Sequence, residues 1–307
     1  VRLQKGSGSI SLLTRSMALE NNAVVLLDKE PGVTSFSALS SFRTAAGRRC
    51  GHAGTLDKFA SGLLIAFSGR YTRLNDVFMG LDKRYEATVE FGKETDSLDP
   101  EGLIVREAEV PSFDAIKNAL HSFNGGYLQA PPAYSAVHID GKRAYQRARN
   151  GEEVEIPKRQ VIIHSLDIIS WEPPFLKIDM KVSKGFYVRS FARDLANECS
   201  SAAYLCALRR TSIGPYCVSE AVSSGDLAGI VRKIAEFEPV PFISRLDGVT
   251  RIDVDIQQAE RLANGVIPDG LLGEAGENCL IVLFCNDGRL CSVTDRNGRF
   301  ICQAGTR

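Results

Sequence analysis

The sequence predicts an α+β fold: a mixed, largely antiparallel sheet flanked by helices, followed by a small, mostly β domain. Apolar runs of strand length occur among segments of helical spacing over most of the chain. Pro239 and Pro241 indicate a linker, after which the sequence changes to short strand-like runs with Asp-Gly and Asn-Gly turns. We therefore expect an N-terminal extension outside the fold, a large domain and a small domain, over residues 1–22, 23–238 and 239–307.

The first part of the large domain contains two expected strands and one helix. Residues 23–28 form an apolar run before a Pro-Gly turn, which is typical of a buried strand. Residues 35–47 have helical spacing, with Ser or Thr available as the N-cap and Gly47 as the stop. A glycine-rich loop follows, and the apolar run 62–69 is short enough to be a strand.

The rest of the chain alternates strands and helices. Residues 84–92 alternate apolar and polar side chains, as a half-buried strand does. Turn formers fill 93–102, and their acids do not match a calcium loop, so we expect a hairpin or loop. Further expected elements are a helix over 112–125 closed by Gly125, strands over 159–172 and 175–183, helices at the start of 187–214 and over 225–237, and, in the small domain, a helix over 251–265 followed by short strands.

Composition places the chain among ordinary soluble proteins, with 44% hydrophobic and 24% charged residues. The formal net charge of +0 argues mildly against nucleic-acid binding, although local basic patches decide the affinity for phosphates. The apolar runs are too short to cross a bilayer and the N-terminus lacks the features of a signal peptide. We therefore expect a cytoplasmic protein that makes no membrane contact.

The eight cysteines form no C-x-x-C pair, and the four histidines are not clustered with them. Structural zinc normally needs such close pairs. We therefore expect no metal site, and reduced thiols as in other cytosolic proteins.

Basic residues gather around the glycine-rich loop and again after residues 131–141. Basic side chains mixed with aromatic ones suit a phosphate backbone with stacked bases. A solvated charged face is also open, since acids such as Glu152 and Glu153 dilute the second group. That group consists of Lys142, Arg143, Arg147 and Arg149, interleaved with Tyr134 and Tyr145.

Asp57 is the first candidate for chemistry. It lies between a loop containing Gly51 and Gly54 and a predicted buried strand, where an acid is in position to face a cleft at a sheet edge. A turn or helix-cap aspartate is the other interpretation, and it is common. His52 has no companion metal ligands; its ring could stack on an unstacked base, or it could be structural or simply exposed.

Tyr187 and Arg189 are two residues apart and share a face if this stretch is a strand end. An arginine that reaches a lone carboxylate would hold it ionised and oriented. An ordinary surface arginine is the alternative. The chain contains no Ser-His-Asp grouping, Walker loop or dinucleotide fingerprint.

Six stretches, taken together and in order, resemble the TruB family of pseudouridine synthases. The stretch "GHAGTLDKFASGLLIAFSGRYTRL" resembles the central catalytic motif of that family, and "DKEPGVTS" resembles its N-terminal motif. The later blocks are "KRYEATVEFGKETDSLDPEG", "PPAYSAVHIDGKRAYQRARNGEEVEIPKR", "SKGFYVRSFARDLA" and "YLCALRRTSIG". The resemblance runs from about residue 23 to 220.

The resemblance implies a reaction and a set of site residues. In the TruB family an aspartate isomerises uridine in RNA to pseudouridine, with no metal or other cofactor. By motif position, Asp57 is that carboxylate, Tyr85 stacks on the flipped base, and Arg189 pairs with the aspartate. The other matched positions are His52, which takes part in flipping the nucleotide, Tyr187 and Leu208, which line the base pocket, and Lys29, which supports the site.

The resemblance also implies a pseudouridine-synthase fold over 23–238 and, on the stretch "AERLANGVIPDG", a PUA-like RNA-binding domain over 239–307. A β appendage that does not touch RNA is the alternative for the second. The implied partner is the T-stem-loop of tRNA, in which the uridine at position 55 of the T-loop is modified. We expect the enzyme to be a monomer. Ribosomal or another RNA, a non-catalytic RNA-binding or tRNA-folding protein, and a base-excising glycosylase are the alternatives.

Two positions depart from the family pattern. Glu30 stands where the family usually has proline, which comes one residue later as Pro31. Lys58 follows the aspartate directly, where the family commonly has proline, and it places a charge beside the carboxylate. We expect these departures to affect substrate fit more than activity.

Overall fold

The computed structural model describes residues 22–47, 49–123, 125–134, 138–139, 142–143, 156–273, 280–286, 290–295 and 297–303. The chain forms two compact units, and each combines separate stretches of sequence. The first unit comprises Val1–Leu56, Leu63–Met79 and Gly214–Arg307, and the second comprises Asp57–Gly62 and Gly80–Ile213. The division predicted at residues 238 and 239 stays a prediction.

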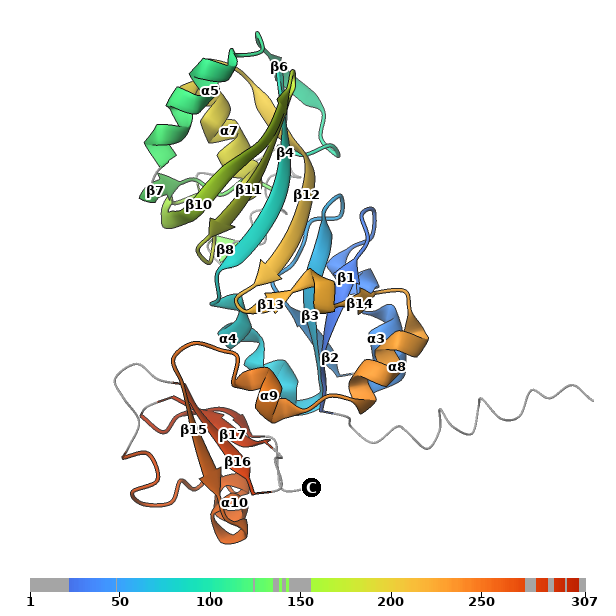
Figure 1. Cartoon of the computed structure of the whole chain (residues 1–307), viewed down its shortest axis with the longest axis vertical. Coiled ribbons are helices and arrows are strands. Elements are labelled where there is room, and N and C mark those ends of the chain that lie inside the picture. The colour runs from blue at the N-terminus through green and yellow to red at the C-terminus, as the bar shows by residue number, and fades with distance from the viewer. Residues whose placement is uncertain are drawn as a thin grey trace, which may run out of the picture. The chain divides into compact units, whose positions relative to one another are not determined.

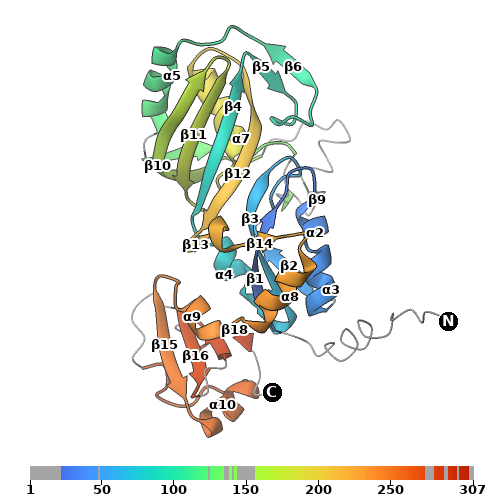
Figure 2. The ribbon, with the colours of Figure 1, turned by 45° about the vertical axis from the view of Figure 1, so that its right-hand side comes forward.

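The second unit is built on an antiparallel sheet, with two helices against one of its faces (Figures 1 and 2). The strand order is β12 (Ala203–Ile213), β4 (Lys83–Phe91), β11 (Phe175–Val182), β10 (Arg159–Glu172) and β7 (Gly125–Gln129). The helices are α5 (Phe113–Leu120), followed by the turn η2 (His121–Phe123), and α7 (Val188–Glu198). Two short hairpins, β5 (Lys93–Thr95) with β6 (Ile104–Glu107) and β8 (His138–Ile139) with β9 (Lys142–Arg143), complete it.

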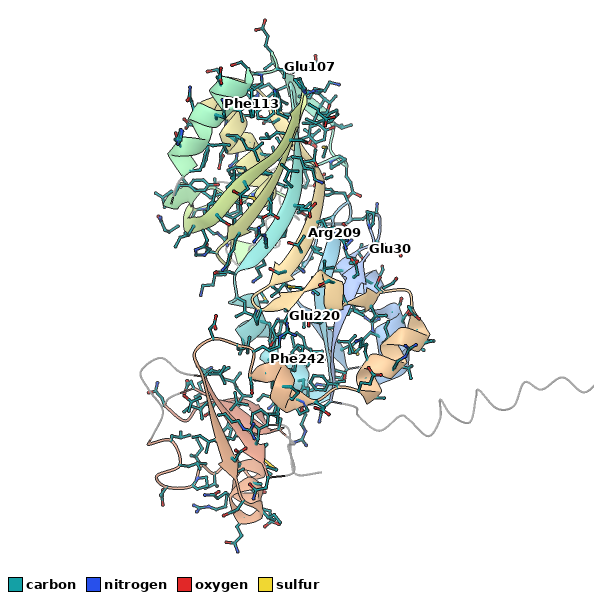
Figure 3. The ribbon with its side chains drawn as sticks, viewed as in Figure 1. Glu30, Glu107, Phe113, Arg209, Glu220 and Phe242 are labelled. Atoms are coloured by element: carbon teal, nitrogen blue, oxygen red, sulfur yellow. A yellow bond between two sulfur atoms is a disulfide. The ribbon has the colours of Figure 1, made fainter. Side chains whose placement is uncertain are left out.

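Alternation along β4 explains how this sheet forms. Every second residue, from Lys83 to Phe91, is buried, as the period of a strand with one face on a core requires. Helix α7 buries Phe191 and Leu195 completely in the same unit. Each such side chain contributes roughly 1.5–3 kcal/mol on burial. Phe113 on α5 (labelled in Figure 3) stacks on Trp171 of β10, with ring centroids 6.4 Å apart.

The first unit centres on β1 (Val24–Lys29), which lies between β14 (Val222–Ser223) and β3 (Ser61–Ser68). Strand β2 (Cys50–Ala53) pairs antiparallel with β3. Helices pack on this sheet through a hydrophobic core that includes Leu27, Phe42, Leu64 and Ile230. The helical segments are α2 (Ser35–Ala38), α3 (Ser40–Ala46), η1 (Gly69–Leu74), α4 (Asn75–Met79), η3 (Val218–Glu220), α8 (Leu227–Ala235) and α9 (Pro239–Ile243), and β13 (Tyr216–Cys217) precedes η3.

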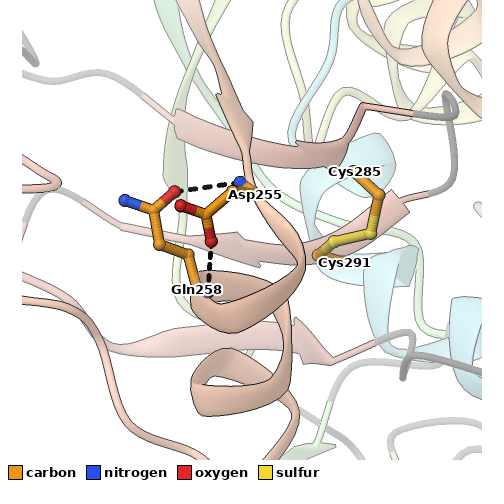
Figure 4. Close-up of a disulfide and its surroundings, with 4 residues drawn as sticks. All are labelled: Asp255, Gln258, Cys285 and Cys291. Atoms are coloured by element: carbon orange, nitrogen blue, oxygen red, sulfur yellow. Dashed lines mark hydrogen bonds between the residues drawn. A yellow bond between two sulfur atoms is a disulfide. The ribbon is translucent and has the colours of Figure 1, made fainter.

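The last part of the chain forms a four-stranded sheet in the order β15 (Val249–Val254), β16 (Leu280–Cys285), β17 (Leu290–Thr294) and β18 (Phe300–Gln303). Helix α10 (Ile256–Ala263) starts with a capping box, in which Asp255 and Gln258 each bind the other's backbone N–H (Figure 4). A disulfide joins Cys285 to Cys291 (Figure 4).

The predicted fold class is confirmed. Most neighbouring strands are antiparallel, and the sheet is mixed because β1 runs parallel to β14 and β3 runs parallel to β12 at Ser61 and Gly62. The hairpin expected over 93–102 is present as β5 and β6. No helix in the described ranges has the length and apolar character that crossing a bilayer requires.

Three local expectations are wrong, each for a physical reason. The glycine-rich loop expected before residue 62 contains strand β2, since pairing with β3 outweighs its glycines. The linker expected at Pro239 and Pro241 is the start of helix α9, because proline is compatible with the first helical turn. The helix expected over 251–265 starts only at Ile256, because the residues before it pair with β16 as strand β15. The helix expected at the start of 187–214 is confirmed as α7, which ends at Glu198.

The expectation of reduced thiols is also wrong for one cysteine pair. Cys285 ends β16 and Cys291 lies in β17, and the antiparallel pairing of these strands brings their Cα atoms to 6.1 Å. That separation lies within the range that a disulfide spans. A search for C-x-x-C spacing misses such a pair because its approach depends on the hairpin.

A substitution at Gly62 tests how closely the backbone of Gly62 approaches that of Arg210. It has φ +104, and a Cβ there would lie 2.3 Å from the carbonyl oxygen of Arg210. We expect Gly62→Ala to lower the free energy of unfolding by roughly 3–5 kcal/mol, the sum of backbone strain and overpacking. Gly47→Ala is the matched control, since Gly47 has φ +99 and no atom within 4 Å of its Cβ position. Equal losses in urea unfolding would contradict the close approach.

Candidate active site

The backbone around Asp57 is fixed on both sides. Before it, the Ser35 hydroxyl accepts from the Leu56 N–H at 2.8 Å and lies 2.9 Å from the Leu56 carbonyl, to which it donates. After it, the Asp57 carbonyl accepts from the N–H of Ala60 at 3.2 Å, which closes a tight turn. The carboxylate therefore projects from a restrained loop, as a reacting group must.

Arg189, in the first turn of α7, makes the main contact with that carboxylate. Its Nη2 donates to Asp57 Oδ1 at 3.1 Å, and its Nε lies 3.0 Å from Oδ2 outside hydrogen-bond geometry. The remaining N–H groups donate to the carbonyls of Ser97 and Tyr134, both at 2.9 Å, and to Asp99. Only 6% of the Arg189 side chain is exposed, so these contacts replace its hydration.

Asp99 is the site residue that the sequence reasoning missed. Its Oδ2 accepts from Arg189 Nη1 at 3.0 Å, and its Oδ1 accepts from the Ser97 hydroxyl at 2.6 Å and from the Glu101 N–H at 3.0 Å. The guanidinium therefore lies between two carboxylates. The available signal was the group of acids in the turn-rich segment 93–102, whose spacing does not match a calcium loop.

Arg189 does not by itself decide the pKa of Asp57, because burial and other charges also shift it. Burial raises the pKa of the Asp57 carboxyl above its ordinary value, and Arg189 offsets this only in part. The carboxylates of Asp99 and Glu101 add to the rise. The pKa of Asp57 therefore stays above its ordinary value even though Arg189 contacts the carboxylate.

A cavity of about 360 Å³ opens beside the carboxylate, within the size range of ligand pockets. The exposed part of Asp57, 37% of its side chain, faces this cavity. Its lining consists of Asp57, Lys58, Asp96, Ser97, Asp99, Glu101, Gly102, Leu103, Tyr134 and Arg189. Within the described residues, no three His, Cys, Asp or Glu side chains come together as a metal-binding group.

Tyr85 lies on β4, is 8% exposed, and faces Arg210 of β12 in the strand register. The guanidinium of Arg210 is fully buried; burial lowers its pKa, while a hydrogen bond with Tyr85 and the charge of Asp57 oppose the shift. Arg210 therefore interacts electrostatically with both Tyr85 and Asp57. Lys83, two residues before it, is also buried, and burial together with Arg210 lowers its pKa to about 8.

Tyr187 and Leu208 belong to the same unit but not to the lining of the cavity, in so far as the structure describes it. Tyr187 is the N-cap residue of α7, and Gln129 binds both its N–H and its carbonyl, at 2.8 and 3.0 Å. The strand end on which Tyr187 and Arg189 would share a face is not formed here, because Arg189 lies in helix α7. Leu208 is 9% exposed on β12, opposite Ala87.

His52 and Lys29 belong to the first unit. His52 lies on β2 opposite Ala66 of β3. Lys29 ends β1 with no exposed surface, and its Nζ donates to the carbonyls of Glu30 and Val33 at 3.0 and 2.7 Å. Lys29 thus fixes the turn that follows β1. Of the basic group after residue 141, Arg147 and Arg149 lie outside the described residues.

The comparison with solved structures identifies the class of fold. A chain of the "Cbf5-Nop10-Gar1 Complex" crystal structure matches with a TM-score of 0.66, over 90% of this chain and 78% of that chain, at 20% identity. The "archaeal box H/ACA sRNP Nop10-Cbf5 complex" matches with a TM-score of 0.62, over 94% and 81%, at 18% identity. The fold is that of the pseudouridine synthases.

Sequence relatives define the family. The "tRNA pseudouridine synthase B" of Borreliella burgdorferi is 45% identical over 199 residues, 64% of this chain and 71% of that protein. The protein of the same name from Aromatoleum aromaticum is 38% identical over 279 residues, 90% and 89% of the two chains. The model of the TruB family pseudouridylate synthase N-terminal domain matches residues 43–188. The chain belongs to the TruB family and is a pseudouridine synthase.

Asp99→Asn tests whether Asp99 forms a buried ion pair with the Arg189 guanidinium that also contacts Asp57. The change keeps the shape of the side chain but removes the charge that Arg189 Nη1 contacts, so we expect the free energy of unfolding to fall by roughly 1.5–3 kcal/mol. Glu86→Gln is the control, because the Glu86 side chain is 40% exposed and pairs with Lys177 at 3.3 Å. An exposed pair contributes about 0–1 kcal/mol. Similar losses for both variants in urea unfolding would argue against a buried ion pair.

The lowered pKa of Lys83 predicts how the stability of the fold depends on pH. Its pKa of about 8 lies below the ordinary 10.5, so between these values the unfolded chain binds more protons than the folded one. Stability from this group therefore rises with pH across that window. We expect the free energy of unfolding of the native chain, relative to Lys83→Met, to increase from about pH 8 to 10.5. A constant difference would mean that Lys83 titrates normally.

Proposed function

We propose that this pseudouridine synthase acts on the T-loop uridine of tRNA, with Asp57 as the catalytic carboxylate. The observation that carries the proposal is the Asp57 carboxylate, held by Arg189 at 3.1 Å and partly exposed to a cavity. The names of the relatives support tRNA as the substrate. Matching of the six sequence blocks supports the T-stem-loop as the part recognised.

The reaction is an isomerisation, and it balances without a co-reactant. The bond from C1′ to N1 breaks, the base rotates in the pocket, and C1′ bonds to C5. The proton on C5 leaves and N1 gains one. No electrons are exchanged with an outside group, so the stoichiometry calls for no cofactor. Asp57 can attack C6 of the base, attack C1′, or remove the C2′ proton; each route needs it ionised.

Access to the uridine requires that its base leave the stack. Extrusion costs a few kcal/mol, and stacking on an aromatic ring returns roughly 1–3 kcal/mol. We assign the stacking ring to Tyr85, nucleotide flipping to His52, the pocket walls to Tyr187 and Leu208, and support of the site to Lys29. We further propose that the protein works as a monomer in the cytoplasm and that its C-terminal sheet contacts the RNA.

A tritium experiment tests the reaction and the role of Asp57. A T-stem-loop RNA with tritium at C5 of the target uridine is incubated with the native chain, with Asp57→Asn, and with Asp114→Asn as an exposed-carboxylate control. We expect tritium release from the native chain and the control and none from Asp57→Asn, since an amide is neither nucleophile nor base.

Other outcomes separate the alternatives. Release from Asp57→Asn would remove Asp57 from catalysis. No release from the native chain, with the RNA still bound, would favour another RNA substrate or a role in tRNA binding and folding. Free uracil among the products would indicate a glycosylase.

The raised pKa of Asp57 predicts the acid limb of the pH profile. The active form is the carboxylate, so kcat/KM falls as pH decreases through the pKa of the free protein. Because burial raises that pKa above 3.8, we expect the midpoint of the limb to lie above this value. A midpoint at or below 3.8, measured by initial rates of tritium release, would contradict the burial that the structure shows.

A further inference from the structure

Lys58 follows Asp57 directly in the chain, at a position where the TruB family commonly has proline. Its Nζ lies 2.9 Å from Glu101 Oε1, and both residues line the cavity beside Asp57. The two side chains are about half exposed, at 52% and 48%. This ion pair therefore stands at the open side of the cavity.

The charges of the cavity lining show what Lys58 contributes. Four of the lining residues are acids, and they would repel the phosphates of an RNA. The lining has two cations, Lys58 and Arg189. Arg189 is 6% exposed and donates to Asp57, Asp99 and two carbonyls, so it has no surface to offer a phosphate. Lys58 is the cation of this lining that an incoming ligand can reach.

The contact that holds Lys58 is easily exchanged. Ion pairs between exposed side chains contribute little to stability, because water and salt compete with them. The lysine ammonium is a point charge on a flexible stem, and it can leave one anion for another without a matched geometry. A phosphate beside the cavity competes directly with Glu101 for it.

We propose that Lys58 is an RNA-binding residue of this enzyme: it exchanges Glu101 for a phosphate of the target nucleotide or of a nucleotide next to it. The position follows from the chain itself, because a side chain adjacent to Asp57 reaches only phosphates near the uridine that Asp57 attacks. The proposal rests on the proposed function, which places that uridine in the cavity.

Glu101 is the partner that Lys58 leaves in this exchange. In the free protein its charge is matched by Lys58, which limits repulsion at the mouth of the cavity. The same carboxylate raises the pKa of Asp57. Removing the charge of Glu101 takes away one anion that competes with an RNA phosphate for Lys58.

Salt dependence of KM tests the proposal. Initial rates on the tritiated T-stem-loop RNA are measured over a series of salt concentrations for the native chain, Lys58→Gln, Lys58→Arg and Glu101→Gln. One lost phosphate contact lowers the slope of log KM against log salt by about 0.7–0.9. We expect this loss and a severalfold higher KM at low salt for Lys58→Gln, with kcat unchanged. Lys58→Arg should keep the native slope, and Glu101→Gln should lower KM.

Lys177→Gln is the matched control, since Lys177 also pairs with a glutamate, at 3.3 Å and 44% exposure, but does not line the cavity. An unchanged slope for Lys58→Gln, or an equal loss for Lys177→Gln, would overturn the proposal. If the native chain releases no tritium, the proposed function fails for this RNA. The slopes are then taken from RNA binding, and a binding slope that is the same in Lys58→Gln as in the native chain overturns the role of Lys58 separately.

Discussion

The contact on which the candidate site depends is the buried guanidinium of Arg189 between the carboxylates of Asp57 and Asp99. A cation with 6% of its surface exposed has lost most of its water, so protein oxygens must replace that water. Those oxygens come from the Asp57 loop, the segment 97–99 and Tyr134. One side chain therefore fixes three separate stretches of chain around a single cavity.

A second constraint comes from the pairing of β3 and β4 with β12. Gly62 lies so close to the backbone of Arg210 that no side chain fits, and Tyr85 faces Arg210 across the sheet. The end of the Asp57 loop, at Ser61 and Gly62, is thus fixed against the strand that carries Arg210. Burial lowers the pKa of both Arg210 and Lys83, and the charge of Arg210 lowers that of Lys83 further. The sheet therefore holds two buried basic side chains close to Tyr85.

Periodicity and residue type predicted the parts of the molecule that depend on local sequence. The alternation over 84–92 predicted strand β4, whereas the local pattern around Asp57 left a turn or helix-cap aspartate open. Asp99 was missed because its role depends on a contact with Arg189, ninety residues away in sequence. Strand β2 and the Cys285–Cys291 disulfide were missed for the same reason, since both depend on pairing between strands. The motifs, not the periodicity, connected Arg189 with Asp57.

Net charge proved a poor guide to the partner. Equal numbers of acidic and basic residues, 37 of each, gave a mild argument against nucleic-acid binding, yet the relatives are named tRNA pseudouridine synthase B. The cavity itself is lined by four acids and two cations, and Arg189 contacts two of the acids, Asp57 and Asp99. A lining of this kind attracts a phosphate backbone poorly at long range, so the proposed role of Lys58 depends on one cation beside the cavity and not on the total charge. Binding of a polyanion follows from where single cations lie, which the net charge of a chain does not report.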